Sequence, residues 1–409
     1  MATAAPAPAR WTPTQRHVVT ASYLGWTLDA FDFFLLVFVL KDIAAEFRVG
    51  TPTVTIAVAL TLALRPLGAF LFGRRPILML NIAVFSALSF STAFVPDIVT
   101  FMIVRALFGI GMGGVWGIGA SLSMETIPAS ARGFVSGLLQ SGYSSGYLLA
   151  SVVYGLIYTT VGWRGLFVAG IVPALLLIPY VGAKVPESPV FARAGRPRVS
   201  IAGVLRRHWR LTLYAVVMMT AFNFFSHGVQ DLYPTFLQKQ HGLGPHAVSA
   251  IAILYNVGAI IGCFLFGTLS QRWGRRRTMI TSALLAIPTI WLWAYGPSLP
   301  VLAVGAFLIN FFVQGAWSVI PAHLNELSPG EARGTFPGTV YQLGNLVASS
   351  NLTIQALIAE QGGSYGLALA SVALCAALAI SGLLAFGPEA HGVAMDRDGE
   401  TADPKVSPA

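Results

Sequence analysis

The sequence is poor in charged residues. Only 10% of its 409 residues are Asp, Glu, Lys or Arg, whereas 55% are hydrophobic and the mean hydropathy is +0.71. A soluble globular domain carries about 25% charged residues, so this composition excludes an ordinary soluble protein. Cysteine is scarce too, with only Cys263 and Cys375, both in apolar stretches. The sequence therefore suggests neither a disulfide framework nor a cysteine-based metal site.

Other features that the sequence lacks narrow the function. It has no nucleotide-binding glycine loop, no cluster with metal-ligand spacing and no nucleophile triad. We therefore expect no enzyme, no catalytic residue, no metal and no cofactor, with the proton as coupling ion. The net charge of +9 does not indicate nucleic-acid binding, because the excess Lys and Arg lie in short loops. The first apolar run, from about Val18, is long and contains acids, which favours a membrane span over a cleaved signal peptide.

What the sequence does contain is a series of apolar runs long enough to cross a bilayer, which takes about 20 residues as a helix. We predict twelve spans, at 18–40, 53–73, 76–95, 98–123, 133–156, 164–183, 210–236, 247–270, 278–296, 299–324, 334–358 and 364–386. The expected fold is an all-α membrane protein of two six-helix bundles, at 1–183 and 210–386. A linker at 184–209 joins them, and the tail at 387–409 is expected to be disordered.

Lys and Arg are unevenly distributed between the loops. Nineteen lie in the termini and in every second loop, four lie in the intervening loops, and two, Arg65 and Arg105, lie inside spans. The positive-inside rule therefore places both termini in the cytoplasm. The short loops and termini are typical of a bacterial protein, so we predict a multi-pass protein of the inner membrane.

The two halves of the chain repeat one another. Gly68-Ala-Phe-Leu-Phe-Gly73 matches Gly262-Cys-Phe-Leu-Phe-Gly267 at an offset of 194 residues, whereas Arg74-Arg75 matches Arg275-Arg276 at an offset of 201. The first half therefore lacks an equivalent of Thr268–Gly274. The link that remains between spans 2 and 3 is a very tight one, and the adjoining span ends would have to unwind.

Two acid–base pairs are related by the same offset of 201 residues. Glu125 and Arg132 follow span 4, and Glu326 and Arg333 follow span 10. We predict that each pair latches the cytoplasmic side in one alternating-access state and breaks in the other. Because the first half lacks part of its loop, the outward-open state is expected to be held less firmly, by about 1–3 kcal/mol.

Two six-span halves, a basic central loop and a repeated Gly…Arg-Arg link resemble the major facilitator superfamily over the whole chain. Gly267-Thr-Leu-Ser-Gln-Arg-Trp-Gly-Arg-Arg-Arg277 is similar to the family's signature between spans 8 and 9, although Gln271 stands where that signature often has an acid. This loop supplies Arg272 and Arg275 to the predicted gate. Arg105-Ala-Leu-Phe-Gly-Ile-Gly111 resembles the span-4 signature.

Span 5 lacks the Gly-Pro signature of the family's antiporters, because 133–146 contains no proline. This absence favours symport or uniport.

Span 7 carries a polar stripe within an apolar run. The stripe covers about 140° of the helix surface, and its members are Asn223, Ser226, His227, Gln230 and Asp231. Such a stripe must face protein or water rather than lipid. His227 and Asp231 are four residues apart, so they are predicted to form a coupled acid pair, or else a buried pair that only fixes helix packing. Pro234 cannot donate to the carbonyl of Gln230, which weakens the helix there.

The pattern Asn223-x-x-Ser226-His227-x-x-Gln230-Asp231-x-x-x-Thr235 resembles the motif of yeast lactate permeases, which belong to one broad group with bacterial sialic acid transporters and carboxylate permeases. Gly25-Trp-Thr-Leu-Asp-Ala-Phe-Asp-Phe-Phe34 and Arg65-Pro66-Leu-Gly68 resemble that group as well. The resemblance implies that His227 and Asp231 handle protons and substrate. Asn223 and Gln230 would then orient substrate oxygens.

Two acids and two arginines lie inside the N-terminal spans. Asp29 and Asp32 stand near the middle of span 1, where a buried carboxylate is costly unless it is paired or protonated. We expect at least one to titrate during transport, the alternative being a hydrogen bond that fixes a span–span contact. Arg105 is predicted to pair with one of them, for coupling or as a permanent structural ion pair. Arg65 is predicted to bind the substrate carboxylate in two-point contact, or else to snorkel toward the interface.

Polar and aromatic residues of spans 5, 10 and 11, including Tyr143, Gln314 and Asn345, are predicted to complete the pocket. The whole pattern predicts a monomeric, proton-coupled symporter of a small organic acid, most simply lactate or pyruvate, working by alternating access in a lipid bilayer. Sialic acid or an aromatic acid is the alternative substrate. The alternative of another class is a membrane sensor, or a variant disabled by the short link between spans 2 and 3.

Overall fold

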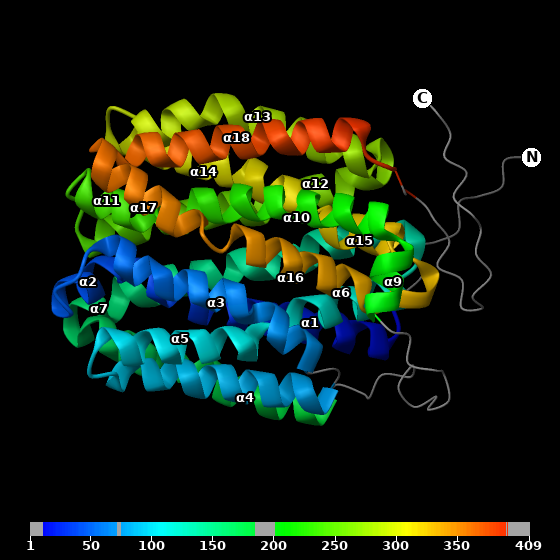
Figure 1. The fold of residues 1–409 in the computed structure, drawn as a ribbon, viewed down its shortest axis with the longest axis horizontal. Helices are drawn as coiled ribbons and strands as arrows, with labels where there is room; N and C mark the ends of the chain where they lie inside the picture. The colour runs from blue at the N-terminus through cyan, green and yellow to red at the C-terminus, as the bar shows by residue number, and fades with distance from the viewer. Residues whose placement is uncertain (1–10, 72–74, 185–200, 390, 392–409) are drawn as a thin grey trace, which may run out of the picture.

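A computed structural model describes residues 11–71, 75–184, 201–389 and 391. Its helices run along the long axis of the molecule (Figure 1). The N-terminal half contains α1 (Pro13–Phe38), α2 (Leu40–Glu46), α3 (Thr51–Leu71), α4 (Arg75–Ser91), α5 (Ile98–Met112), α6 (Val115–Thr126) and α7 (Arg132–Lys184). The C-terminal half follows α9 (Ile201–Arg207) and contains α10 (Trp209–Gln230), α11 (Tyr233–Lys239), α12 (Pro245–Trp273), α13 (Arg275–Tyr295), α14 (Leu299–Trp317), α15 (Ile320–Leu327), α16 (Phe336–Ala348), α17 (Asn351–Gly362) and α18 (Tyr365–Phe386).

These helices account for the twelve predicted spans. The described residues contain nine helical stretches long and apolar enough to cross a membrane. One of them, Ala129–Tyr180, holds two spans, because α7 turns at Gly162, where φ is 65° and ψ is −174°. The shorter apolar helix Met79–Phe94 and the pair α16 and α17 supply the remaining two. The predicted all-α membrane fold of twelve helices is therefore confirmed.

In the described residues, four spans are interrupted instead of continuous. The breaks lie between α5 and α6, α10 and α11, α14 and α15, and α16 and α17. A helix end in an apolar setting leaves backbone groups that need partners. Ser136 of α7 satisfies one break by donating to the carbonyl of Ser318 at 2.5 Å and accepting from the amide of Ala322 at 3.1 Å. Gln342 of α16 donates to the carbonyl of Gly113 at 2.5 Å, so each half supports a break in the other.

The two halves lie side by side, with the helices of the N-terminal half drawn from blue to green, where α7 ends, and those of the C-terminal half from green to red (Figure 1). Within the first half, α1 packs on α6 and α7, and α3 packs on α5. Within the second, α14 packs on α12 and α13, and α18 packs on α10 and α13. The halves meet where α7 contacts α12 and where α3 contacts α16 and α17.

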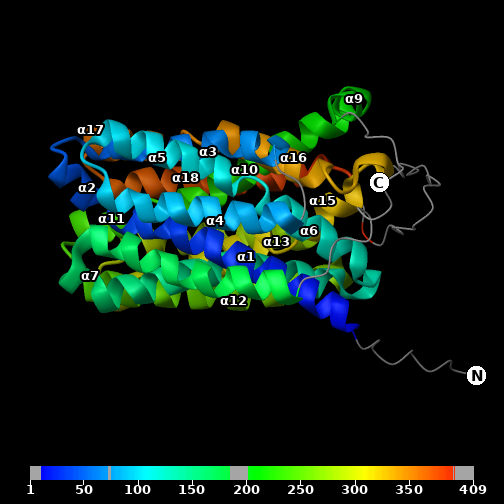
Figure 2. The same ribbon diagram turned by 90° about the horizontal axis from the view of Figure 1, so that it is seen from below.

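The two ends of the bundle can be told apart by their short helices. One end, called here the α9 end, carries α9 and α15 and is where α1 begins and α18 ends (Figures 1 and 2). The other, called the α2 end, carries α2 and α11.

The halves touch at both ends. At the α9 end, a Cβ added to Gly117 of α6 would lie 2.7 Å from the Cα of Gly338 in α16. At the α2 end, Lys239 donates to Thr51 at 2.6 Å and lies 3.8 Å from Glu360. The halves therefore contact each other at both ends of the bundle.

Some predictions fall on residues that the structure does not describe. The link with the seven-residue gap lies at 72–74, outside the described residues, where α3 stops at Leu71 and α4 begins at Arg75. Most of the predicted linker, 185–200, and nearly all of the predicted tail also lie outside them.

Candidate functional site

A buried ion pair between α1 and α3 forms the core of the candidate site. Nη2 of Arg65 lies 3.4 Å from Oδ2 of Asp29, and the two side chains are 2% and 0% exposed. The guanidinium also lies 3.4 Å from Sδ of Met112 and 5.7 Å from the ring centroid of Phe33. Arg65 therefore points into the protein, and the snorkelling alternative is wrong.

Aromatic rings from both halves gather at this ion pair. Tyr341 of α16 interacts with the Arg65 guanidinium and lies 6.4 Å, 4.4 Å and 6.0 Å from the rings of three tryptophans. With Tyr143 of α7, stacked on Trp26 at 5.3 Å, they form what we call the aromatic cluster. Its members are Trp26, Trp116, Tyr143, Trp317 and Tyr341. No local pattern selects Trp116, but Trp26 is three residues before Asp29 and so shares its helix face.

Arg105 was predicted to pair with Asp29 or Asp32, and it forms an ion pair within 4.0 Å with neither, since Arg65 pairs with Asp29. None of the three guanidinium nitrogens of Arg105 has a hydrogen-bond partner among the described residues. The group lies 3.9 Å from the ring centroid of Phe108 and interacts with Asp32 only at longer range. Asp32 instead accepts a hydrogen bond from Ser89 at 3.1 Å.

His227 and Asp231 lie together in the C-terminal half, as their spacing predicts. Nδ1 of His227 is 2.9 Å from Oδ2 of Asp231, and both side chains are buried. The imidazole lies 5.7 Å from the ring of Phe33 and 6.4 Å from that of Tyr143. The pair therefore faces the ion pair and the aromatic cluster across the interface between the halves.

The helix break beside this pair lies where Pro234 predicts it, since α10 ends at Gln230 and α11 begins at Tyr233. The Gln230 carbonyl, which the proline cannot use, lies 3.5 Å from the hydroxyl of Tyr147 in the other half. The adjacent Val229 carbonyl accepts from Tyr255 at 3.0 Å.

A chain of side-chain hydrogen bonds connects the two halves near this break. Gln140 of α7 donates to Gln314 of α14 at 3.1 Å, and Gln314 donates to Ser226 of α10 at 2.9 Å. Gln230 donates to the same hydroxyl at 2.8 Å. We call these four residues the polar chain.

Several buried amides have polar atoms without hydrogen-bond partners among the described residues, and two of these atoms belong to predicted substrate-binding residues. They are Nδ2 of Asn223 and Oδ1 of Asn345, whose Nδ2 donates to Gln342 at 3.1 Å. Unpartnered buried polar atoms are uncommon and mark places where water or a polar ligand is expected.

The gate at the α9 end is built differently from the prediction. Glu326 pairs with Arg275, at 2.8 Å and 2.9 Å in two-point contact, and not with Arg333. The predicted Glu326–Arg333 pair is therefore wrong. Arg275, at the start of α13, contacts α15 and takes the place at Glu326 that was predicted for Arg333. Arg275 also donates to Ser270 at 2.7 Å and to Gln271 at 3.2 Å.

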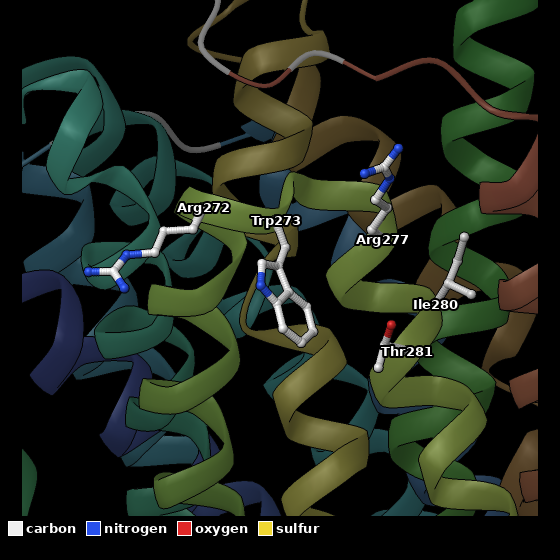
Figure 3. A pocket seen from close by; sticks show the side chains of 5 residues that line it. All are labelled: Arg272, Trp273, Arg277, Ile280 and Thr281. Atoms are coloured by element: carbon white, nitrogen blue, oxygen red, sulfur yellow. The ribbon is translucent and has the colours of Figure 1, made fainter. Parts of the chain in front are cut away.

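The other predicted gate residues lie around this pair. Gln271 accepts from the amide of Gly133 at 3.2 Å, which ties the link to the N-terminal half. Arg132 begins α7 within electrostatic reach of Glu326, and Glu125 is near the end of α6. Arg272 is exposed and lines a surface pocket on the outside of the link (Figure 3).

The Major Facilitator Superfamily model matches residues 23–265 and 222–408. The chain is 30% identical over 377 residues to a carboxylic acid transporter protein homolog of Saccharomyces cerevisiae, covering 83% of this chain and 60% of that protein's length. It is 28% identical to a probable 4-methylmuconolactone transporter of Cupriavidus pinatubonensis, over 97% of both chains.

Among solved structures, the human organic anion transporter MFSD10 superposes with a TM-score of 0.68 and 18% identity, over 91% of this chain and 100% of that one. At this identity the likeness concerns the fold alone.

Proposed function

This chain belongs to the major facilitator superfamily, and from that premise we propose that it is a proton-coupled symporter of an organic acid. The yeast relative is named as a carboxylic acid transporter homolog, which supports an organic acid as the substrate class. The distribution of Lys and Arg supports cytoplasmic termini in an inner membrane, so that the α9 end is cytoplasmic.

The observation that carries the proposal is the contact between Asp29 and Arg65. A guanidinium that holds one carboxylate can hold another of the same geometry. When Asp29 takes up a proton, its attraction for Arg65 is lost and the substrate carboxylate takes its place. The site then contains one proton and one anion more than before, so its net charge is unchanged. A buried site favours such an exchange, because an extra unpaired charge would be costly there.

The His227–Asp231 pair is a second place where a proton can reside. A histidine is the side chain whose ordinary titration range includes neutral pH, and its carboxylate neighbour couples the two groups. Since the imidazole faces Phe33 and Tyr143, a change of its charge acts directly on the binding region. Asp32 remains a further candidate, and Arg105 its electrostatic partner.

Alternating access follows from the contacts at the two ends. Opening the α9 end separates Gly117 from Gly338, and opening the α2 end separates Lys239 from Thr51. The substrate would bind between the halves, next to the polar chain. The binding free energy of the substrate then differs between the states open at the α9 end and at the α2 end. This difference couples substrate binding to opening.

Lactate and pyruvate are the simplest candidate substrates. The aromatic cluster favours a second candidate, a planar unsaturated or aromatic acid, because aromatic rings stack on flat π systems. The two candidates share the Arg65 contact and differ in how much they gain from the cluster.

The test uses purified protein in proteoliposomes with an inward proton gradient. We expect concentrative uptake of labelled lactate or of a labelled aromatic acid, with matched acidification of the lumen. Asp29→Asn should lose concentrative uptake but keep substrate exchange, since exchange needs no net proton movement. Arg65→Lys should raise KM about tenfold or more, the effect of losing one charge-assisted hydrogen bond.

Asp97→Asn is the matched control, because Asp97 is exposed and Asn caps a helix as well as Asp. Undiminished accumulation by Asp29→Asn would contradict the proposed coupling. If the wild-type protein transports none of the acids tested, the result would instead favour the alternative of a variant disabled by the short link between spans 2 and 3.

A further inference from the structure

A surface pocket lies on the outer face of the link between α12 and α13, at the α9 end (Figure 3). It is lined by Arg272, Trp273, Arg277, Ile280 and Thr281. The link is the single residue Gly274, whose φ of 88° favours glycine. Figure 3 shows Arg272 and Arg277 leaving the link on either side of the Trp273 ring.

Four arginines flank the link, one at the end of α12 and three at the start of α13, and two of them are already engaged. Arg275 is turned inward to Glu326, and Arg276 donates to the carbonyls of Leu384 and Ala385 at the end of α18. The amide at the start of α13 is occupied too, since Arg276 N donates to Glu389 at 3.1 Å.

The other two arginines are those of the pocket. Arg272 and Arg277 are exposed, and neither forms an ion pair within the described part of the chain. The pocket therefore presents two positive charges, which attract an anion in the absence of a competing carboxylate in its lining.

Below the arginines the surface becomes apolar. Trp273 is 51% exposed, and Leu284 and Leu285, one turn of α13 beyond Ile280 and Thr281, are each 44% exposed. Tryptophan is enriched where the apolar core of a bilayer meets its headgroups. Positive charge, an interfacial ring and an apolar stripe thus follow one another along the helix axis.

We propose that this pocket binds an anionic phospholipid. Guanidinium groups match the oxygens of a phosphate diester in charge and hydrogen-bond geometry. Arg277, on the same side as Ile280 and Thr281, holds the headgroup phosphate, and Arg272, on the other side of Trp273, adds positive charge at the same end of the bundle (Figure 3). Trp273 lies beside the glycerol region, and an acyl chain follows Leu284 toward the middle of the bilayer. Inorganic phosphate shares the headgroup chemistry, but it gains nothing from the apolar stripe.

The site adjoins the gate. Gln271 and Arg275, which connect α12 and α13 to Gly133 and Glu326, lie within the segment that the lipid would hold from outside. A bound phospholipid therefore stabilises the closed α9 end and makes the closed population depend on membrane composition.

The experiment measures lipid binding, so its outcome is independent of the proposed transport activity. Full-length protein is purified from mixed micelles of phosphatidylglycerol and phosphatidylcholine, and retained lipid is counted by native mass spectrometry. We expect retained phosphatidylglycerol to exceed phosphatidylcholine, and to fall about tenfold in Arg272→Gln/Arg277→Gln. The control Arg206→Gln/Arg210→Gln removes two exposed charges near α9 and should retain the lipid.

Equal losses in both double variants would overturn the proposal in favour of general attraction to positive charge. Displacement of the lipid by millimolar inorganic phosphate would overturn it in favour of a free-anion site. Trp273→Phe supplies a second readout, since brominated phosphatidylglycerol should quench wild-type fluorescence more than that of the variant. The melting temperature of each variant in phosphatidylcholine alone shows whether it is folded.

Discussion

Asp29 and Asp32 are three residues apart on α1, yet their surroundings differ. Asp29 contacts a guanidinium, whereas Asp32 accepts a hydroxyl hydrogen bond and has only a distant cation, Arg105. Arg105 in turn has an aromatic ring beneath it and no hydrogen-bond partner among the described residues. A buried charge in that situation depends on the field of the nearest opposite charge.

This dependence gives a prediction for Asp32. Asp32→Asn should destabilise the protein, because it leaves Arg105 buried without an opposing charge. In Asp32→Asn/Arg105→Met part of that loss should be recovered, with a coupling free energy of about 1–3 kcal/mol. The measurement is thermal unfolding of the two single variants and the double variant in detergent. Ser89→Ala is the control, since it removes the hydrogen bond to Asp32 without changing charge, and additive effects would contradict the coupling.

The sequence identifies the important buried residues reliably, but it is a poorer guide to the residues that they contact. Asp29, Arg65 and His227 can be identified from the sequence, because an ionisable group inside an apolar span is energetically costly and usually has a functional role. Their partners depend on which spans are neighbours, and spacing reveals that only within one helix. The His227–Asp231 contact was therefore predicted correctly, while Glu326 was assigned to Arg333 instead of Arg275.

At the scale of elements, hydropathy predicted where the spans lie but not that four are broken. Hydropathy averaged over about 20 residues does not change when one turn of the helix is interrupted. Pro234 predicts the break between α10 and α11, and Gly113-Gly114 is compatible with the break between α5 and α6. The break after Trp317 also has a local signal, since Pro321 in the first turn of α15 cannot donate to the Trp317 carbonyl. At the break after Ala348 neither proline nor glycine is present, and the contacts there come from elsewhere in the chain.

The short helix α2 is fastened to α7 by Glu46, which leads to a prediction on pH. Trp163 donates to Glu46 at 2.6 Å and Arg164 at 2.7 Å. Partial burial raises the pKa of Glu46, but the hydrogen bonds from Arg164 and Trp163 outweigh it and hold the pKa below its ordinary value of 4.5. A depressed pKa means that this contribution to stability is complete above pH 4.5 and is lost as the pH falls through the depressed value.

Glu46→Gln should therefore lower the melting temperature near neutral pH, and the difference from wild type should shrink on acidification. The side chain is 42% exposed, so the effect should stay below about 1 kcal/mol. Melting curves of both proteins across pH check this, with Glu360→Gln, whose partner Lys239 is farther away at 3.8 Å, as the control. A difference in melting temperature between wild type and Glu46→Gln that grows toward low pH would contradict this prediction.

At the scale of the whole molecule, composition and the internal repeat were enough to predict two six-helix halves. They could not say how the halves meet, because that depends on small residues whose neighbours lie far away in sequence. Gly117 and Gly338 are the clearest case, since their backbones touch across the interface at the α9 end.

Gly117→Ala should therefore favour the state open at the α9 end. The added methyl group cannot fit against the Gly338 backbone while that end is closed, and the closed population should fall several-fold. Spin labels at Ser130→Cys and Thr335→Cys, both exposed and in different halves, would report the distance after Cys375 is replaced. Gly330→Ala is the control, because nothing lies within 4 Å of its added Cβ. An unchanged distance distribution in Gly117→Ala would show that these glycines do not set the gate.

The supports that each half provides for a break in the other have a further consequence. When the α9 end opens, the carbonyl of Ser318 and the amide of Ala322 lose Ser136, and the carbonyl of Gly113 loses Gln342. In the interior of a membrane protein only incoming water can replace those hydrogen bonds. Opening is then a hydration reaction as much as a movement of helices. Its equilibrium responds to osmotic pressure, and solutes too large to enter the cleft oppose it.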